Sequence, residues 1–367
     1  MLRKRVILLV PLLALFEFVA PTEERTEAAT WGCTGKDIKP GNDIDAIINN
    51  DPSGSATTFC VDAGTYQVSA PAILKAGDKL IGQPGTTNPV QKCTAGGSCV
   101  NTKVPQPIPV VKLVGSGTAN LLRARGRNIS ISWVDLSRAS GTGTGSGAIT
   151  AGSASSDFVV QFARIHDNAS LGISNMNGTV RDSEFFSNSK AQTSLGFNGS
   201  AVKGITEFEA ARVFVHDEQG NGFWCDVGCK NSARTTMTPK CPTGCFWVHD
   251  SVVVNSGRAG IRYENSPNEA LFENNEIHGN GKTERRGGID IRDSQNAWVG
   301  SGNNFGPATI AGVTYLVNGD RIGVRATDSG RSDRVNLSNV DVVGNTLNGE
   351  TITGCEQPDN IVACSGN

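Results

Sequence analysis

One short phrase recurs along the chain: a glycine, then an apolar or small residue, then positions that alternate in character. The copies are Gly147-Ala148-Ile149, Gly172-Ile173-Ser174-Asn175-Met176, Gly196-Phe197-Asn198-Gly199-Ser200, Gly222-Phe223-Trp224-Cys225-Asp226, Gly260-Ile261-Arg262-Tyr263-Glu264, Gly288-Ile289-Asp290-Ile291-Arg292 and Gly323-Val324-Arg325. A period of about 25 residues with some longer intervals is typical of a solenoid with loop insertions. Since each turn of a solenoid buries its apolar side only against its neighbours, we expect one elongated domain.

The composition favours a β-rich, turn-rich chain over a helical one. Among 367 residues there are 44 glycines, and aromatic residues make up 6%. The hydrophobic fraction of 38% is enough for a narrow core. The formal net charge is −2. No basic tract follows the first residues, which argues against nucleic acid as a partner.

Residues 1–30 have the features of a signal peptide. Arg3, Lys4 and Arg5 form a charged start, an apolar stretch follows, and Ala28 and Ala29 offer small residues for cleavage. The apolar stretch is short for a membrane span, although an uncleaved N-terminal anchor is the alternative. We therefore predict a secreted or cell-surface protein outside the cytoplasm.

The cysteines agree with export. There are ten, and they fall in close groups: Cys33 and Cys60; Cys93 and Cys99; Cys225, Cys229, Cys241 and Cys245; Cys355 and Cys364. An even number of cysteines in an exported chain indicates disulfides, although the central quartet could instead hold zinc. Pairing Cys225 with Cys245 and Cys229 with Cys241 would close the inserted loop as a finger, but spacing alone leaves the connectivity open.

The rest of the chain divides into an entry segment, a repeat region and a tail. Residues 31–125 are expected to form an N-terminal cap and the first turns, with a short capping helix after Asn42-Asp43 and strands at 58–61, 64–68 and 79–82. Residues 84–109 are expected to form a long loop tied by a disulfide or used in function. The repeats cover 126–350 with inserted loops at 229–241 and 281–287, and 351–367 form a disulfide-tied tail.

Each repeat adds a second apolar phrase after the glycine phrase, such as Val252-Val253-Val254-Asn255. Asn168, Asn188, Asn255 and Asn280 lie a few residues before the next glycine phrase, where asparagine tolerates left-handed backbone and can bond to the neighbouring turn. Short strands of one direction joined by turns predict an all-β chain that forms a right-handed parallel β-helix.

The entry phrases Thr-Phe-Cys-Val-Asp-Ala-Gly-Thr-Tyr (58–66) and Leu-Ile-Gly (80–82), and glycine phrases such as 260–264, resemble the secreted bacterial right-handed parallel β-helix proteins of the pectate-lyase-like superfamily. The resemblance covers roughly 31–350. It implies the fold but not one activity, because that superfamily includes polysaccharide lyases, hydrolases and epimerases, tailspikes and adhesins.

The candidate site comes from laying the glycine phrases in register. Side chains alternate between the two sides of a strand, so Ile173, Phe197, Phe223, Ile261 and Ile289 should stack inside. The outward positions are then neutral in the early turns and charged or aromatic in three consecutive later ones. These outward residues are Trp224, Asp226, Arg262, Glu264, Asp290 and Arg292.

Asp226 and Glu264 are the predicted catalytic carboxylates, because neighbouring strands lie ~4.8 Å apart and two carboxylates that close can share acid and base roles. The same pair could instead hold Ca²⁺, a cation that prefers oxygen ligands. The resemblance implies that Ca²⁺ bridges a uronate to the protein in the lyases and that an arginine can remove the neighbouring proton. Arg262 or Arg292 would take that role, although no superfamily active-site motif is matched.

Trp224 and Asp290 complete the site as predicted substrate-binding residues. The alternative is structural, since Glu264 opposite Arg292 and Arg262 opposite Asp290 would make a stabilising checkerboard of charges. The histidines are expected at solvated or turn-bonding positions. By register His166 and His216 align with Val254 and His278, while His249-Asp250 could serve as a general base.

We therefore expect an extracellular polysaccharide-active protein, a lyase or hydrolase of an acidic glycan, that works as a monomer. One alternative is a non-catalytic carbohydrate-binding or surface-adhesion module that uses the same face. A β-helix without a ligand is the other.

Overall fold

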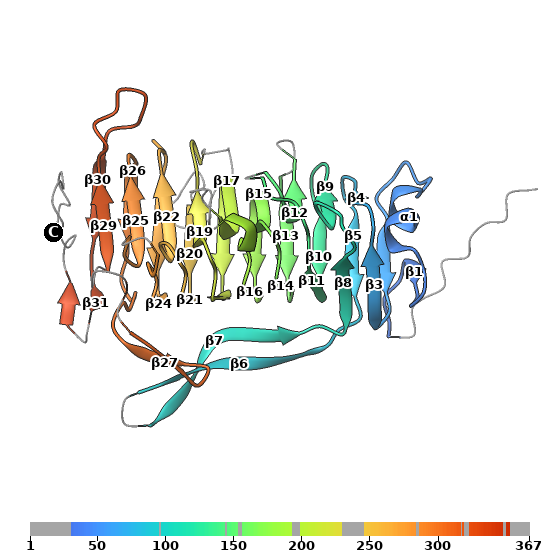
Figure 1. Cartoon of the computed structure of the whole chain (residues 1–367), viewed down its shortest axis with the longest axis horizontal. Coiled ribbons are helices and arrows are strands. Elements are labelled where there is room, and N and C mark those ends of the chain that lie inside the picture. Colours follow the sequence, from blue (N-terminus) through green and yellow to red (C-terminus); the bar gives the residue numbers. More distant parts are fainter. Residues whose placement is uncertain are drawn as a thin grey trace, which may run out of the picture.

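The computed structural model describes residues 31–352, except 95–96, 144, 153–155, 193–198, 230–245, 284–285, 317, 319–322 and 348–349. The described chain is a right-handed parallel β-helix with three faces, as the sequence predicts (Figure 1). Each turn of the solenoid, called a rung below, adds short strands to these faces. The predicted signal peptide, most of the C-terminal tail, and Cys241, Cys245, Cys355 and Cys364 lie outside the described residues.

The first face carries the glycine phrases. Its strands are β4 (Ala72–Leu74), β9 (Leu122–Ala124), β12 (Gly147–Ala151), β15 (Leu171–Arg181), β17 (Ser200–Ala211), β19 (Asn221–Cys225), β22 (Ile261–Glu264), β25 (Ile289–Arg292) and β29 (Val324–Thr327). The second face contains the C-terminal parts of β15 and β17, so the first two faces form one continuous sheet.

The other strands of the second face are β1 (Lys36–Ile38), β2 (Thr58–Val61), β5 (Lys79–Gly82), β10 (Ser130–Ser132), β13 (Phe158–Gln161), β20 (Phe246–His249), β23 (Ala270–Glu273), β26 (Gln295–Val299) and β30 (Ser338–Val342). The third face consists of β3 (Gly64–Val68), β8 (Val111–Gly115), β11 (Val134–Ser137), β14 (Arg164–His166), β16 (Glu184–Phe186), β18 (Phe214–His216), β21 (Val252–Val254) and β24 (Glu276–His278). Lys190–Gln192 form a 3-10 turn, and β31 (Asn345–Leu347) and β32 (Glu350–Ile352) pair antiparallel.

The core is a column of apolar side chains stacked from rung to rung. On the first face the fully buried column is Ile173, Val202, Phe223, Ile261, Ile289 and Val324. Val202 takes the position that the sequence predicts for Phe197, because β17 begins at Ser200, the last residue of the glycine phrase at Gly196. One core cluster extends from Ile38 to Val342, so the entry segment and the repeats share a single core.

The helix α1 (Ile44–Asn49) lies at the N-terminal end of the solenoid, as predicted (Figure 1). Its N-cap residue Asp43 accepts a hydrogen bond from the Ala46 amide at 3.1 Å, which satisfies one of the free N–H groups of the first turn. Ile44 and Ile48 are buried in the core, so the helix covers the end of the apolar column. The predicted strands at 58–61, 64–68 and 79–82 are also present.

Asparagine ladders secure the turns. Between the second and third faces, Asn303 Oδ1 accepts hydrogen bonds from the Asn275 amide (3.1 Å) and Nδ2 (2.9 Å), and Asn345 does the same for Asn303 (3.2 and 2.8 Å). All three side chains are buried. Because an unpaired buried amide is costly, each asparagine holds its rung in register with the next.

A second ladder joins the third face to the first. Asn168 donates to Asn188 at 2.8 Å, and the Asn280 Oδ1 accepts from the Ser256 amide at 3.0 Å, as predicted for asparagines at these turns. Asn255 lies one position earlier, where its φ is 65°, and its side chain donates to Asp217. It therefore supports the turn from outside the ladder.

Glu218 occupies the ladder position that follows Asn188. It accepts a hydrogen bond from Asn188 Nδ2 at 2.6 Å, while its Oε2 is buried without a hydrogen-bond partner. Burial in this apolar surrounding raises the pKa of Glu218 to about 8. A protonated acid resembles the amide of an asparagine, which is why the ladder accommodates it.

The segment 84–109 is a β-hairpin rather than the predicted loop. Its strands β6 (Thr86–Cys93) and β7 (Cys99–Ile108) pair antiparallel, and the disulfide Cys93–Cys99 ties them near the tip. A second hairpin, β27 (Ala308–Ile310) and β28 (Val313–Tyr315), adds to the edge of β6 (Figure 1). Packing against the third face explains why the segment is ordered.

That packing joins residues from distant parts of the sequence. Val90 and Val104 of the hairpin share a small apolar cluster with Phe214 and Val252 of the third face. Gln106 also donates a hydrogen bond to the buried carboxylate of Glu184 at 2.6 Å. In the part of the chain that the structure describes, no helix is long and apolar enough to cross a membrane.

Candidate functional site

A charged strip crosses five consecutive rungs on the outward side of the first face. Parallel pairing aligns its members in one row: Lys203, Trp224, Arg262, Asp290 and Arg325. A second row beside it aligns Glu264 with Arg292 and Arg292 with Thr327. We call these two rows, with Asp226 at the end of β19, the first-face strip.

The register confirms the predicted alternation of charges in β22 and β25. Arg262 lies opposite Asp290, and Glu264 lies opposite Arg292. The contact that Glu264 makes is nevertheless with its own strand, since Arg262 donates to its Oε1 at 2.5 Å. Arg292 approaches the neighbouring Asp293 at 3.6 Å.

Asp226 begins the turn after β19, because the paired part of that strand ends at Cys225. Its Oδ2 lies 2.8 Å from Lys203 Nζ, and the same ammonium group lies 4.3 Å from the centre of the Trp224 ring. Lys203 thus bridges the predicted stacking residue and one predicted catalytic carboxylate. Asp226 and Glu264 each face a cation of their own.

The strip is buried although it lies on the outer side of the solenoid. Arg262 and Asp290 are each 1% exposed, Trp224 is 3% exposed, and Glu264 and Lys203 are 8% and 9% exposed. Charges removed from water must be paired to be tolerated, and most of these charges are. At the edge, Asp226 and Arg292 keep more contact with solvent.

The second inserted loop contributes to the strip. Arg286, which follows its undescribed residues 284–285, lies 3.3 Å from the Asp290 carboxylate. Thr283, on the other side of that gap, donates to the Gly257 carbonyl at 2.8 Å. The loop is therefore anchored beside the strip, as expected for a segment that borders a site.

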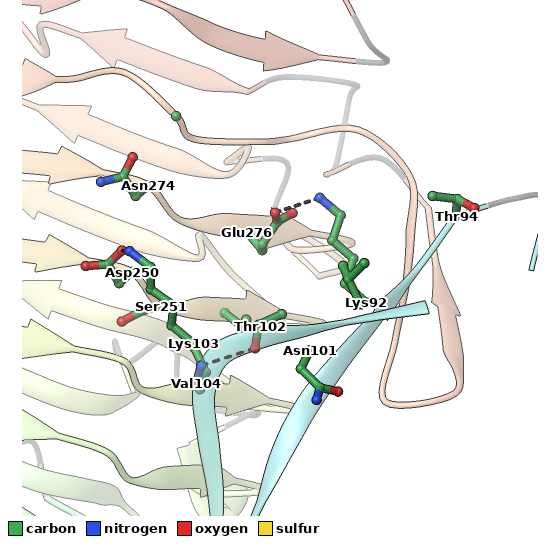
Figure 2. A pocket seen from close by; sticks show the side chains of 13 residues that line it. Lys92, Thr94, Asn101, Thr102, Lys103, Val104, Asp250, Ser251, Asn274 and Glu276 are labelled. Atoms are coloured by element: carbon green, nitrogen blue, oxygen red, sulfur yellow. Dashed lines mark hydrogen bonds and ion pairs between the residues drawn. The ribbon is translucent and has the colours of Figure 1, made fainter. Parts of the chain in front are cut away.

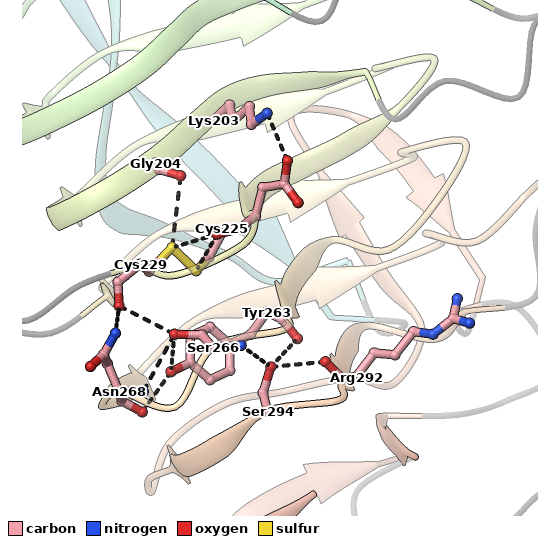
Figure 3. Close-up of a disulfide and its surroundings, with 10 residues drawn as sticks. Lys203, Gly204, Cys225, Cys229, Tyr263, Ser266, Asn268, Arg292 and Ser294 are labelled. Atoms are coloured by element: carbon pink, nitrogen blue, oxygen red, sulfur yellow. Dashed lines mark hydrogen bonds and ion pairs between the residues drawn. A yellow bond between two sulfur atoms is a disulfide. The ribbon is translucent and has the colours of Figure 1, made fainter. Parts of the chain in front are cut away.

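The disulfide at the strip joins Cys225 to Cys229 and so differs from the proposed pairing with Cys245 and Cys241 (Figure 3). The chain turns back at Gly228, where φ is 69°, and this brings the two Cα atoms within 5.9 Å. The Cys229 carbonyl in turn accepts a hydrogen bond from Ser266 at 3.2 Å. The turn that carries Asp226 is therefore fixed to the rung of β22.

Lys203 is a member of the strip that the sequence did not predict. The glycine phrase at Gly196 suggested Asn198 and Ser200 as outward residues of that rung, but Val202 pairs with Phe223 and Lys203 with Trp224. The sequence pattern that marks this rung is the alternating run Ala201-Val202-Lys203-Gly204, which does not begin with a glycine as the other phrases do.

Each of the four histidines is the last residue of a strand (β14, β18, β20 or β24), and His166, His216 and His249 each bond to the aspartate that begins the following turn. His166, His216, Val254 and His278 align in one row of the third face, through Phe186. Both ring nitrogens of His166, His216 and His278 have protein partners, and each histidine bonds to at least one carboxylate.

His216 shows the arrangement in detail. Its Nδ1 lies 2.8 Å from Asp217, and its Nε2 lies 3.1 Å from Glu184. Burial lowers the pKa of His216, but the two carboxylates outweigh that effect and raise it to about 8. His249 is held in the same way between Asp250 and Glu209, and its pKa is raised against the effect of burial.

A cavity of about 560 Å³ lies between the hairpin and the corner where the second face meets the third (Figure 2). Lys103 of the hairpin reaches Asp250 at 3.0 Å, and Lys92 reaches Glu276 at 2.6 Å. These two ion pairs connect the hairpin to the solenoid across the cavity.

Calcium would need to displace existing partners at the strip, since Lys203 occupies Asp226 and Arg262 occupies Glu264. Among the described residues, no group of three or more His, Cys, Asp or Glu side chains forms a metal centre. Calcium at this site stays a prediction for a chelation experiment.

The sequence matches no known protein-family model. It has no significant match among curated proteins. Solved structures, by contrast, share its architecture. The A-module of the mannuronan C-5 epimerase AlgE6 from Azotobacter vinelandii superposes with a TM-score of 0.52 at 16% identity, over 83% of this chain and 81% of that one.

Two further structures are similar at lower scores. An alginate lyase from Paenibacillus sp. gives a TM-score of 0.43 at 14% identity, over 83% of this chain and 99% of that one. Pectate lyase Pel9A also gives 0.43, at 12% identity, over 86% and 80%. The similarity to the AlgE6 A-module, at a TM-score of 0.52, shows a shared parallel β-helix fold, and all of these similarities concern the fold alone.

Proposed function

We propose that this chain is an extracytoplasmic, polysaccharide-active protein that takes an acidic glycan along its first face. The observation that carries the proposal is the first-face strip, in which charged side chains less than a tenth exposed lie on the outward side of consecutive rungs. Outward positions of a solenoid need no buried charge for folding, and such pairs add little stability on balance. The structural neighbour with a TM-score of 0.52 is a mannuronan epimerase, which fits this proposal.

Binding is assigned to the cations and the indole of the strip. Arg262 and Arg292 lie on adjacent rungs, where guanidinium groups can each receive a uronate carboxylate in a two-point contact. Trp224 and Asp290 are 3% and 1% exposed, so a glycan contacts the indole and this carboxylate only after it displaces the side chains that cover them. Rungs ~4.8 Å apart repeat at a spacing close to that of successive pyranose rings, so a glycan can run along the solenoid axis.

Catalysis is assigned to Asp226 and Glu264. In the resting protein both carboxylates are held by cations, at 2.8 Å by Lys203 and at 2.5 Å by Arg262. A bound uronate brings its own carboxylate, which competes for Lys203 and Arg262 and frees Asp226 and Glu264 for proton transfer. The substrate thus supplies the charge that releases the catalytic groups.

Two reactions are compatible with this arrangement. In a lyase, one freed carboxylate takes the proton from the carbon next to the uronate carboxyl group. The carbon–carbon double bond forms as the bond to the leaving sugar oxygen breaks, and the other carboxyl group, in its protonated form, gives its proton to that oxygen. In a hydrolase, one carboxylic acid protonates the glycosidic oxygen while the other carboxylate attacks the sugar or activates water.

A second candidate function is a non-catalytic carbohydrate-binding or adhesion module that uses the same face. The ion pairs favour it, because paired charges suit a preformed binding surface as well as an active site. The described disulfides Cys33–Cys60, Cys93–Cys99 and Cys225–Cys229 support an oxidising, extracytoplasmic compartment for either candidate. A monomer is proposed for both.

The test is a screen of polyuronates for ultraviolet-absorbing unsaturated products and for new reducing ends, each with and without a chelator. Asp226→Asn and Glu264→Gln should each reduce turnover by at least about 100-fold, the range of a lost acid–base group. Asp333→Asn, at an exposed ion pair with Arg331, is the matched control and should keep full activity. Equal activity in all three variants would exclude the strip as the active site, and binding without product would establish the module.

A further inference from the structure

Two tryptophans lie on the outward side of the second face, away from the first-face strip. Pairing aligns Trp247, Leu271 and Trp298 on three consecutive rungs, and we call this row the tryptophan strip. Trp298 is 41% exposed, and Leu271 is 1% exposed with Trp247 packed against it. Since neighbouring strands lie ~4.8 Å apart, the two indoles are roughly 10 Å apart along the solenoid axis.

The indole of Trp247 is held rigidly. The ring of Trp247 stacks on His249 with centroids 3.9 Å apart, and His249 is fixed in turn by Glu209 at 3.3 Å and Asp250 at 2.9 Å. An aromatic side chain that is already fixed loses little entropy when a ligand stacks on it. The strip is therefore a preorganised platform.

Carboxylates surround this platform. The register places Glu209 on the rung before Trp247 and Asp341 on the rung after Trp298. Glu273 lies opposite His249 on the neighbouring outward row. Carboxylates accept hydrogen bonds from sugar hydroxyl groups but repel uronates, so the charge here selects against an acidic glycan.

The strip ends at the cavity beside the hairpin. Asp250, Asn274 and Gly302, which follow β20, β23 and β26 in sequence, line the cavity from the solenoid. Lys92 and Lys103 line it from the hairpin (Figure 2). Polar side chains therefore face a solvent-filled space at the end of the strands that carry the two indoles.

We propose that the tryptophan strip and this cavity bind a neutral, hydroxyl-rich polysaccharide. One pyranose ring stacks on each indole, the chain between them passes over Leu271, and hydroxyl groups at the cavity side bond to Asp250 and Asn274. Sugar rings have apolar faces that match the flat indole, while the carboxylates take the hydroxyl edges. This site goes beyond the proposed function, because it lies on another face and takes a neutral rather than an acidic glycan.

The experiment is affinity electrophoresis of the full chain in gels containing hydroxyethyl cellulose, xyloglucan, galactomannan or polygalacturonate. At least one neutral polysaccharide should retard the protein, and Trp298→Ala should weaken that binding by about tenfold or more. Trp298→Phe should recover part of the affinity, because it restores an aromatic face. Trp133→Ala, a tryptophan stacked on Phe162 at a distant rung, is the matched control and should bind normally.

The outcomes separate this site from the first face. Arg292→Gln should weaken binding to polygalacturonate and leave binding to the neutral polysaccharide unchanged. Trp298→Ala should weaken binding to the neutral polysaccharide and leave binding to polygalacturonate unchanged. The proposal is overturned if no neutral polysaccharide retards the protein, or if Trp298→Ala binds as the native chain does. It is also overturned if Trp298→Ala abolishes polygalacturonate binding instead, or if the only change is loss of self-association in sedimentation. Melting curves establish that each variant is folded, and Trp298, as an exposed side chain, is the variant least at risk.

Discussion

Replacing Glu218 by glutamine should stabilise the protein, and the gain should grow as the pH rises. Glu218 is 1% exposed and lies within a ladder of amides, with a pKa raised to about 8 from the ordinary value of 4.5. Between these two pH values the folded protein keeps a proton that the unfolded chain has lost, so stability falls as the pH rises. Glutamine keeps the acceptor for Asn188 and supplies N–H groups without ionising.

The size of the effect follows from the shift in pKa. One unit corresponds to about 1.4 kcal/mol, so the native chain loses about 3 kcal/mol by pH 7 and about 5 kcal/mol once the pH exceeds 8. Below pH 4.5 both states bind the proton, and the loss vanishes. Glu218→Gln should remove this dependence.

Urea unfolding followed by tryptophan fluorescence measures the difference between the native chain and Glu218→Gln at several pH values from about 5 to 8.5. Asp333→Asn, at an exposed side chain, serves as the control and should show no such trend. A stability difference that stays constant across this range, or a variant destabilised throughout it, would refute the assignment of Glu218 to a protonated ladder position.

Three other variants test the structure. His216→Gln should lower the free energy of unfolding by about 2 kcal/mol near pH 6, and the difference should disappear above pH 8 as the native histidine loses its proton; a difference that persists there contradicts the His216 pKa of about 8. Asn303→Ala should cost about 3 kcal/mol in chemical denaturation, because several buried partners lose their hydrogen bonds, and a cost below about 1 kcal/mol would mean that the ladder is not cooperative. Cys229→Ser should cost about 2 kcal/mol, and peptide mapping under non-reducing conditions should find Cys225 joined to Cys229 in the native chain rather than to Cys245.

Much of the fold follows from the sequence because the solenoid repeats a local rule. In nearly every rung, apolar residues alternate with outward-facing ones, a glycine lies where neighbouring rungs approach closely, and an asparagine lies at a turn. This rule predicted the strands of the entry segment, the buried column of the first face and the ladder that contains Asn168, Asn188 and Asn280, but not the ladder of Asn275, Asn303 and Asn345. It placed one rung wrongly. The glycine phrase at Gly196 predicted Phe197 as the buried residue of that rung, whereas the buried residue of β17 is Val202.

Features that depend on contacts between distant parts of the chain could not be predicted from this repeated pattern. The hairpin of 84–109 is ordered by Phe214, Val252 and β27, which lie far along the chain from it. Lys203 joins the strip through that misplaced rung. The tryptophan strip was not predicted because Trp247 and Trp298 lie in β20 and β26 of the second face, whose strands do not begin with the glycine phrase.

The Cys225–Cys229 disulfide could not be predicted from the sequence, because it depends on the backbone conformation at Gly228. The left-handed turn at Gly228 returns the chain to the end of β19, whereas counting cysteines alone favours pairing across the longer loop. The placement of the first-face strip, by contrast, followed from alternation within β22 and β25.

Titration calorimetry with a size-defined oligogalacturonate and oligomannuronate tests most directly whether the first-face strip receives an acidic glycan, and it does so whether or not the protein is an enzyme. We predict saturable binding that weakens as salt is added, falls by about tenfold or more in Arg292→Gln, and is unchanged in Trp298→Ala. A folded native protein that binds neither acidic oligosaccharide, or an Arg292→Gln variant that binds as tightly as the native chain, would contradict it.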